Sequence, residues 1–363
     1  MAPFAAHAHV RRCNVRAHPP DGHEAATHAW IAAEVARLMR LPLHDPGRAG
    51  SAFYIPDDTL TAAQAQHLGI GSAADLLGGV VPHAFVATKA ISHPLVADDA
   101  AAPAGWQHTL GTALAEATLP GYTAFSAADA LVAYARLCGD GQVRLKLPSG
   151  IGGHGQLLLR DAQALEAAVA AVPAAELAQQ GVVLERHLDR STTFSVGEVD
   201  CAGMTIAYYG TQSSTDDGRG GEAYGGSQLF VMRGTLEALL ARTLPPSQRE
   251  AIAKACHYDR CVAQAYPGFY ASRRNYDVIE GLAEDGTRLC GVLEQSWRIG
   301  GATPAELAAV DAFQREPALQ AVVAASVERY GALALPAECE VYYLGEDPRV
   351  GRLTKYRYAH ADD

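Results

Sequence analysis

The chain has 363 residues, of which 49% are apolar and 19% are charged, and its formal net charge is -11 at pH 7. The apolar content excludes a generally disordered chain, and the length favours two or three domains over one. The negative charge opposes attraction to a phosphate backbone, so we expect no nucleic-acid partner.

No stretch approaches the roughly 18 continuous apolar residues of a membrane helix, and residues 1–12 lack the apolar segment of a signal peptide. We therefore expect a cytoplasmic protein that does not contact a membrane. The seven cysteines form no Cys-x-x-Cys pair, which argues against a disulfide framework. Cys256, His257 and Cys261 form the tightest cluster, but their spacing fits no common zinc site.

The first part of the chain alternates helices and strands. Apolar spacing and turn residues predict a helix over 25–41, a strand over 53–55, a helix ending at 67, and strands over 80–81 and 85–87. Such alternation is typical of an α/β unit with a parallel sheet.

The next part predicts a small two-layer sandwich. Its expected elements are a helix over 127–137, a strand that carries Lys146, a strand over 157–159, a helix over 162–172 and a strand over 182–185. Strand-like segments at the ends of 193–231 and a helix ending near residue 265 follow. The last informative pair of strands, 276–279 and 289–294, flanks an Asp-Gly turn.

Residues 144–156 combine a short apolar strand, which carries Lys146, with a glycine-dense loop. Glycine lets the backbone approach an anion closely, and a lysine anchored on the neighbouring strand supplies positive charge. These features indicate a site for a nucleoside triphosphate. The spacing fits neither a Walker loop nor a Gly-x-Gly-x-x-Gly fingerprint, so a third phosphate-binding architecture has to be considered.

The order of these features resembles the ATP-grasp superfamily: a lysine strand, a glycine loop, a strand ending in Glu185, and then Asp277 and Glu294 on the strands of a hairpin. The resemblance extends from Lys89 to the C-terminus. Segments 81–89 and 224–227 also resemble an uncharacterised bacterial ATP-grasp-like family of no assigned function.

The resemblance implies an α+β ATP-grasp fold that follows a small α/β domain. The implied domains are an N-terminal α/β domain over 1–88, a small subdomain with the glycine loop over 89–190, and a large subdomain with the metal site over 191–363.

The resemblance also implies two cofactors, ATP and Mg²⁺. Lys89 and Lys146 match lysines that contact the ATP phosphates. The matching phosphate-loop residues are Gly150, Gly152, Gly153, His154 and Gly155. The matching adenine-hinge residues are Glu185, Arg186, His187 and Leu188.

Asp277 and Glu294 match the magnesium ligands, in keeping with the preference of Mg²⁺ for carboxylate oxygens. Ser296 replaces the family's asparagine as the third metal residue, and its hydroxyl can still ligate magnesium or hold a water. With Lys146, Arg298 is the candidate catalytic residue, because its guanidinium can steady a transferring phosphoryl group. A ribose-binding glutamate that many relatives carry after the hinge is replaced by residues 192–196. Arg273 and Arg274 are weaker candidates, for which a solvated turn is an equal alternative.

The implied activity is that of a ligase that activates a small-molecule carboxylate as an acyl-phosphate for attack by an amine or similar nucleophile. One alternative is bicarbonate activation, as in biotin carboxylases, and another is an ATP-binding module without catalysis. The sequence identifies neither substrate, and it leaves the oligomeric state open, with a homodimer as one option.

Overall fold

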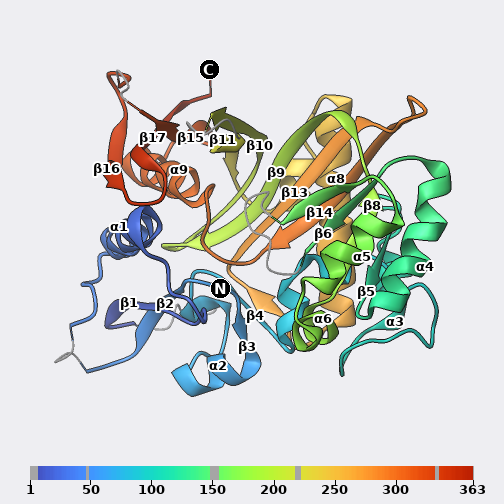
Figure 1. The fold of residues 1–363 in the computed structure, drawn as a ribbon. Helices are drawn as coiled ribbons and strands as arrows, with labels where there is room; N and C mark the ends of the chain where they lie inside the picture. The colour runs from blue at the N-terminus through green and yellow to red at the C-terminus, as the bar shows by residue number, and fades with distance from the viewer. Residues whose placement is uncertain (1–6, 46–48, 148–154, 217–221, 332–334, 363) are drawn as a thin grey trace.

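The computed structural model describes residues 7–45, 49–147, 155–216, 222–331 and 335–362. Within these ranges the strands form an eight-stranded sheet, a four-stranded sheet and two small sheets. The four-stranded sheet and its helices lie on the right in Figure 1, and the blue N-terminal part lies below the large sheet on the left. No helix in the described ranges is long and apolar enough to cross a membrane.

The N-terminal part contains parallel strand pairs, but they are divided between two sheets. Its elements are β1 (His9–Cys13), α1 (Gly22–Met39), β2 (Ala52–Pro56), β3 (Leu60–Thr61), α2 (Ala62–Leu68), η1 (Ala73–Asp75) and β4 (Gly79–Val81). β1 pairs with β2 and β3 pairs with β4, both in parallel. The second sheet is completed by the antiparallel strand β12 (Tyr270–Ala271), which comes from the distant C-terminal half.

The prediction of a strand over 85–87 is wrong. These residues form the 3-10 turn η2 (Ala84–Ala87), which is followed by a second turn, η3 (Lys89–Ser92). The carbonyls of Val86 and Thr88 accept hydrogen bonds from the side-chain amide of Gln295, at 3.1 and 2.7 Å, instead of from a neighbouring strand. A short apolar run cannot reveal such a side-chain partner.

The predicted small sandwich is confirmed. Its antiparallel sheet has the order β5-β8-β6-β7, with β5 (Gly121–Ala124), β6 (Val143–Lys146), β7 (Gln156–Leu159) and β8 (Val182–Arg186). The accompanying helices are α4 (Ala127–Leu137), η4 (Cys138–Asp140), α5 (Ala162–Ala170) and α6 (Ala174–Gln180), whereas Leu110 of the preceding α3 (His108–Ala113) belongs to a different core. Leu145 and Leu184 of the sheet share one core with Ala130 of α4 and Leu165 of α5.

The large sheet is antiparallel throughout and has the order β14-β13-β9-β10-β11-β15-β17-β16. Its strands are β9 (Asp189–Cys201), β10 (Met204–Asp216), β11 (Glu222–Arg233), β13 (Arg273–Leu282), β14 (Arg288–Ser296), β15 (Ala321–Tyr330), β16 (Glu340–Asp347) and β17 (Gly351–Ala361). The helices near it are α7 (Leu236–Leu240), α8 (Pro246–Ala265) and α9 (Thr303–Arg315).

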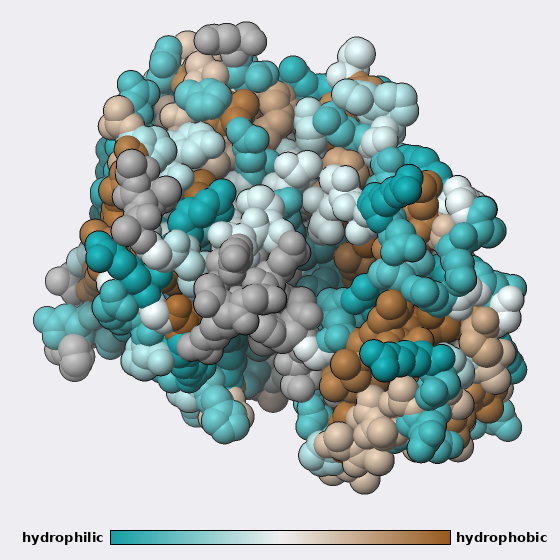
Figure 2. Space-filling model, turned by 45° about the horizontal axis from the view of Figure 1, so that its top comes forward, coloured by the Kyte–Doolittle hydropathy of each residue, from teal (hydrophilic) through white to brown (hydrophobic). Residues whose placement is uncertain are grey.

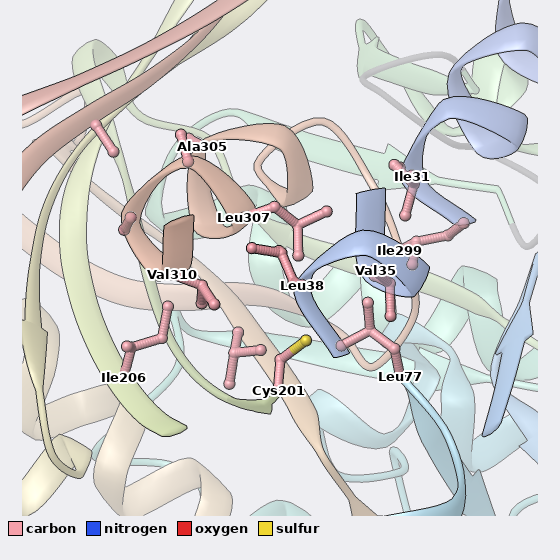
Figure 3. Close-up of a cluster of buried hydrophobic side chains, with 14 of the residues drawn as sticks. Ile31, Val35, Leu38, Leu77, Cys201, Ile206, Ile299, Ala305, Leu307 and Val310 are labelled. Atoms are coloured by element: carbon pink, nitrogen blue, oxygen red, sulfur yellow. The ribbon is translucent and has the colours of Figure 1, made fainter. Parts of the chain in front are cut away.

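The large sheet is covered on both faces. Ile206 and Tyr208 pack with α1 and α9, in the core that Figure 3 shows. Ala207, between them in the sequence, packs on the other side with α7 and α8. This division follows from the alternation of side chains along a strand. The N-terminal helix α1 therefore belongs to the same core as the sheet that carries the predicted metal ligands.

Arg273 is a buried structural residue, so the alternative of a solvated turn is wrong for it. Its Nε and Nη2 donate to the two carboxylate oxygens of Glu306 in α9, at 2.8 and 2.7 Å. Both side chains are at most 2% exposed. Arg273 also donates to the carbonyl of Arg298. One guanidinium thus joins β13, α9 and the chain that follows β14.

We expect Arg273→Met to lower the free energy of unfolding by about 3 to 5 kcal/mol, because it leaves the Glu306 carboxylate buried without its counter-charge. Urea denaturation measures the loss. The double variant Arg273→Met/Glu306→Leu should recover part of it, since no unpaired charge remains. Arg315→Met is the control: that side chain is 73% exposed beside Asp311, so the change should stay below about 1 kcal/mol. Equal losses in the two single variants would contradict this account.

Candidate functional site

Lys146 lies at the end of β6, where the small sheet meets the large one. Its side chain is 2% exposed, and its Nζ lies 2.8 Å from Oε1 of Glu185. The same Nζ donates to the carbonyl of Leu293 in β14, at 3.3 Å. Leu145, the preceding residue, belongs to the core on the other face of the strand, as expected from the alternation. Lys146 therefore connects the two sheets.

Glu185 is the partner that the sheet register provides for Lys146. Lys146 pairs with Val183 across the ladder, so Glu185 is its diagonal neighbour on the same face. The other carboxylate oxygen lies 3.3 Å from Nε2 of His93. Burial alone would raise the pKa of Glu185, but Lys146 and His93 outweigh it and the pKa is lowered. The carboxylate expected to read adenine is thus paired, in this structure, with the predicted phosphate lysine.

The other predicted hinge residues lie where the chain passes between the sheets. His187 and Leu188 are the two residues between β8 and β9. Leu188 is buried with Leu119 and Ala283. Nδ1 of His187 lies 2.9 Å from Arg144, and Arg186 forms an ion pair with Asp140 at 3.2 Å.

The predicted phosphate loop falls largely outside the described residues, and this is the case for Gly150, Gly152, Gly153 and His154. Gly155 is described. Its φ of +72° is in the left-handed region that favours glycine, and its carbonyl accepts a hydrogen bond from Leu147 at 2.8 Å, which continues the β6–β7 pairing.

A β-bulge in the hairpin of β13 and β14 shapes the acidic part of the site. Asp277 pairs with Glu294 and Val278 pairs with Val292, so Leu293 is an extra residue in β14. Bulges re-aim neighbouring side chains and interrupt the ladder, and they are frequent beside active sites. Here the extra residue presents its carbonyl to Lys146. The sequence offered no signal for this bulge.

Asp277 and Glu294 face each other directly across the hairpin, as the sequence predicted. Oδ1 of Asp277 accepts hydrogen bonds from Gln212 at 2.7 Å and from Asn275 at 3.0 Å. Burial, with the nearby Glu294 charge, raises the pKa of Asp277 to about 6. The raised pKa reflects burial and the neighbouring carboxylate, which nearby positive charge offsets only in part. Sequence reasoning missed the supporting roles of Gln212 and Asn275, because neither residue lies in a recognisable motif.

Lys89 approaches the same acidic pair from the N-terminal side. Its Nζ lies 3.6 Å from Oε2 of Glu294, and its side chain is 8% exposed. Burial lowers the pKa of Lys89; the Glu294 charge opposes this effect, and the nearby Lys146 adds to it. Gln295 holds the turns around Lys89 and in turn accepts a hydrogen bond from Tyr258 at 2.8 Å. Gln295 and Tyr258 are thus positioning residues that the sequence did not reveal.

Ser296 and Arg298 follow Glu294 along the chain. Ser296 is opposite Asn275 in the ladder and, two residues after Glu294, is expected on the same face of β14. Arg298 comes just after the strand, and its Nη1 donates to the carbonyl of Ile299 at 3.0 Å. Burial lowers the pKa of Arg298, and the charge of Asp58 opposes the shift.

The donor set at the hairpin fits a magnesium ion that is also bound by phosphate oxygens. Asp277 and Glu294 supply hard oxygen ligands, and Oδ2 of Asp277 accepts no hydrogen bond among the described residues. In the described ranges no group of three or more His, Cys, Asp or Glu side chains could hold a metal ion. Magnesium usually takes only one or two protein carboxylates and completes its shell with water and phosphate, so two carboxylates are sufficient.

Residues 10–357 match the family described as "Protein of unknown function (DUF3182)", and the chain belongs to this family. A search of curated proteins finds no match.

Two solved structures show a loose overall similarity. One is D-alanyl-alanine synthetase A from Vibrio cholerae, with 13% identity, a TM-score of 0.45, and coverage of 82% of this chain and 91% of that one. The other is phosphoribosylamine–glycine ligase from Thermotoga maritima, with 14% identity, a TM-score of 0.48, and coverage of 97% and 92%. The structure places a lysine strand in the small sheet and an acidic hairpin at the edge of the large sheet, in the order that the sequence predicted.

Figure 2 shows one face of the molecule with a hollow near its centre, between a lobe on the right and the rest of the molecule.

We expect Asp277→Asn to stabilise the metal-free protein by about 3 kcal/mol above pH 6, because it removes a buried charge beside Glu294. The folded-state pKa of about 6 exceeds the ordinary value of 3.8. The gain should therefore be absent below pH 3.8, grow between 3.8 and 6, and stay constant above. Urea denaturation in EDTA across this range measures it. The exposed Glu346→Gln is the control, and an equal gain for Asp277→Asn at pH 3.5 and pH 7.5 would contradict the assignment.

Proposed function

We propose that this protein is an ATP- and magnesium-dependent ligase. In the reaction a small-molecule carboxylate is activated as an acyl-phosphate, which an amine or similar nucleophile then attacks. One observation carries the proposal: two buried lysines and two facing carboxylates, from segments far apart in the sequence, meet at the junction of the two sheets.

Lys89 and Lys146 would hold the phosphates of ATP. Each ammonium group is almost completely buried and lies beside a carboxylate, Glu294 or Glu185. A buried ammonium group is stable only with negative charge next to it, and phosphate oxygens can supply that charge as well as a carboxylate can. The two lysines come from different parts of the fold, so a shared phosphate chain would draw η3 and β6 together.

Asp277 and Glu294 would hold magnesium, which neutralises charge on the phosphoryl group during transfer. Gln212 and Asn275 both donate to Oδ1 of Asp277 and thereby fix the orientation of this carboxylate. Arg298 would steady the transferring group or the substrate carboxylate through its planar set of donors. In this reaction the protein mainly positions reactants and balances charge, so no nucleophilic side chain is required.

We expect Lys146→Ala to abolish nucleotide binding, as measured by titration calorimetry with ATP and Mg²⁺. Because this change leaves Glu185 without its main counter-charge, the double variant Lys146→Met/Glu185→Gln removes both charges and should fold more stably, yet bind no nucleotide. Circular dichroism checks folding. Lys254→Ala on α8, whose Nζ bonds the carbonyl of Glu116 at 2.6 Å, is the matched control and should bind normally. Unchanged ATP affinity in a folded Lys146 variant would count decisively against the assignment.

We expect Glu294→Ala to keep the fold but lose magnesium-dependent turnover, because half of the carboxylate pair is removed. Release of ADP is measured with a panel of carboxylates and amines, and bicarbonate is included to test the biotin-carboxylase alternative. Glu284→Ala, in the exposed turn of the same hairpin, is the control. Magnesium activation equal to that of the wild type in Glu294→Ala would exclude this metal site. Nucleotide-induced thermal stabilisation without ADP release from any substrate would instead favour a non-catalytic binding module.

A further inference from the structure

Two arginines from distant parts of the chain converge on one carboxylate beside the proposed site. Arg16 lies between β1 and α1, Arg298 follows β14, and Asp58 lies between β2 and β3. Nε of Arg16 is 3.6 Å from Oδ2 of Asp58, and Nε of Arg298 is 3.7 Å from Oδ1. We call these three residues the arginine clamp. The N-terminal part of the chain thus supplies two of its three members.

The arginine clamp is electrostatically paired but poorly hydrogen-bonded. Distances of 3.6 and 3.7 Å are too long for hydrogen bonds from either guanidinium to Asp58. Nε and Nη2 of Arg16 are shielded from solvent and have no hydrogen-bond partner among the described residues. The third nitrogen of this guanidinium, Nη1, donates a hydrogen bond to Oε1 of Glu24 at 2.8 Å. Buried donors without acceptors are costly, by about 1 to 3 kcal/mol each.

Asp58 is held in a way that allows it to be displaced. Its side chain is 40% exposed, whereas those of Arg16 and Arg298 are 13% and 22% exposed. The hydrogen bond described for its carboxylate comes from the amide of Thr59, next to it in the chain, at 2.8 Å. Arg16 is more firmly fixed, because Asp57 accepts a hydrogen bond from the amide of the neighbouring Val15 at 2.7 Å. The carboxylate can therefore swing outward while Arg16 stays in place.

The arginine clamp lies next to the acidic hairpin. Arg298 is four residues after Glu294 and interacts electrostatically with both Glu294 and Asp58. Arg273, which is fixed by Glu306, donates to the carbonyl of Arg298 and holds the backbone there. A ligand bound by the arginine clamp would thus lie beside the predicted magnesium ligands. A guanidinium pair suits carboxylate and phosphate oxygens, because the planar donors match them in geometry and charge.

We propose that Arg16 and Arg298 bind an oxyanion group, a carboxylate or a phosphate, of the substrate, and that Asp58 occupies this position until the substrate displaces it. The inference rests on the proposed function for the identity of the ligand as a substrate. It adds a binding role for the N-terminal part of the chain: Arg16 supplies Nε and Nη2, which have no hydrogen-bond partner in the described ranges, and Asp58 acts as an internal competitor.

The test measures anion binding by the full chain. Sodium acetate and inorganic phosphate are the probes, and the rise in unfolding temperature at constant ionic strength reports their binding. We expect Asp58→Asn to lower the half-saturating anion concentration about tenfold, because it removes the competitor. Arg16→Gln should raise it about tenfold, because it removes a charged hydrogen-bond donor. Arg12→Gln is the matched control, since Arg12 is an exposed arginine of β1, and it should behave as the wild type.

The two probes distinguish the source of the oxyanion: stronger binding of acetate indicates a carboxylate group, and stronger binding of phosphate indicates a phosphate group. Wild-type half-saturation in both Asp58→Asn and Arg16→Gln would overturn the proposal, as would a wild-type protein that neither anion stabilises. If Arg16→Gln fails to fold, the response of Asp58→Asn alone decides. Nucleotide binding by the wild type is measured in parallel. If the wild type binds no nucleotide, the ligase proposal is wrong, but the anion measurements still test the binding role of Arg16 and Asp58.

Discussion

The ion pair between Lys146 and Glu185 is the constraint on which the site depends. Burying two charges is expensive unless each is close to its partner and further hydrogen-bonded. Lys146 meets this requirement with Glu185 at 2.8 Å and the Leu293 carbonyl at 3.3 Å, and Glu185 meets it with His93 as well. Since Leu293 belongs to the large sheet, satisfying this lysine also sets the position of the small sheet. The contacts that stabilise the buried charge of Lys146 therefore also fix the two sheets relative to each other.

The acidic hairpin shows the complementary arrangement, an excess of negative charge that the protein only partly neutralises. Asp277 and Glu294 are held opposite each other by the ladder, and the pKa of Asp277 is raised by burial and by Glu294. Lys89 reaches Glu294 at 3.6 Å. Like charges forced together favour the binding of a cation, and that is the electrostatic condition for a metal site. At the junction of the two sheets, each lysine therefore lies beside a carboxylate: Lys89 beside Glu294, and Lys146 beside Glu185.

Side chains without charge decide how precisely these groups are held. Gln295 binds the backbone on either side of Ala87 and is itself held by Tyr258, so the turn that carries Lys89 is fixed to β14. Gln212 and Asn275 orient Asp277 in the same way. Such amides can donate to a carbonyl or carboxylate without adding charge, so they set geometry while the electrostatic balance is left to the lysines and acids.

The sequence by itself determined the local elements and the pairings that follow from a strand's alternation and a short turn. It predicted the helix α4 and the pairing of Asp277 with Glu294 across their hairpin. It also predicted that Lys146 and its apolar chain neighbour Leu145 lie on opposite faces of their strand. Only the tertiary structure decided the 3-10 turns around Lys89, the bulge at Leu293, the burial of Arg273 and the approach of Arg16 to Arg298. Periodicity reports which face of an element is buried, but it carries no information about which distant side chain lies against that face. These features depend on contacts between residues far apart in the chain, and such contacts exist only once the chain has folded.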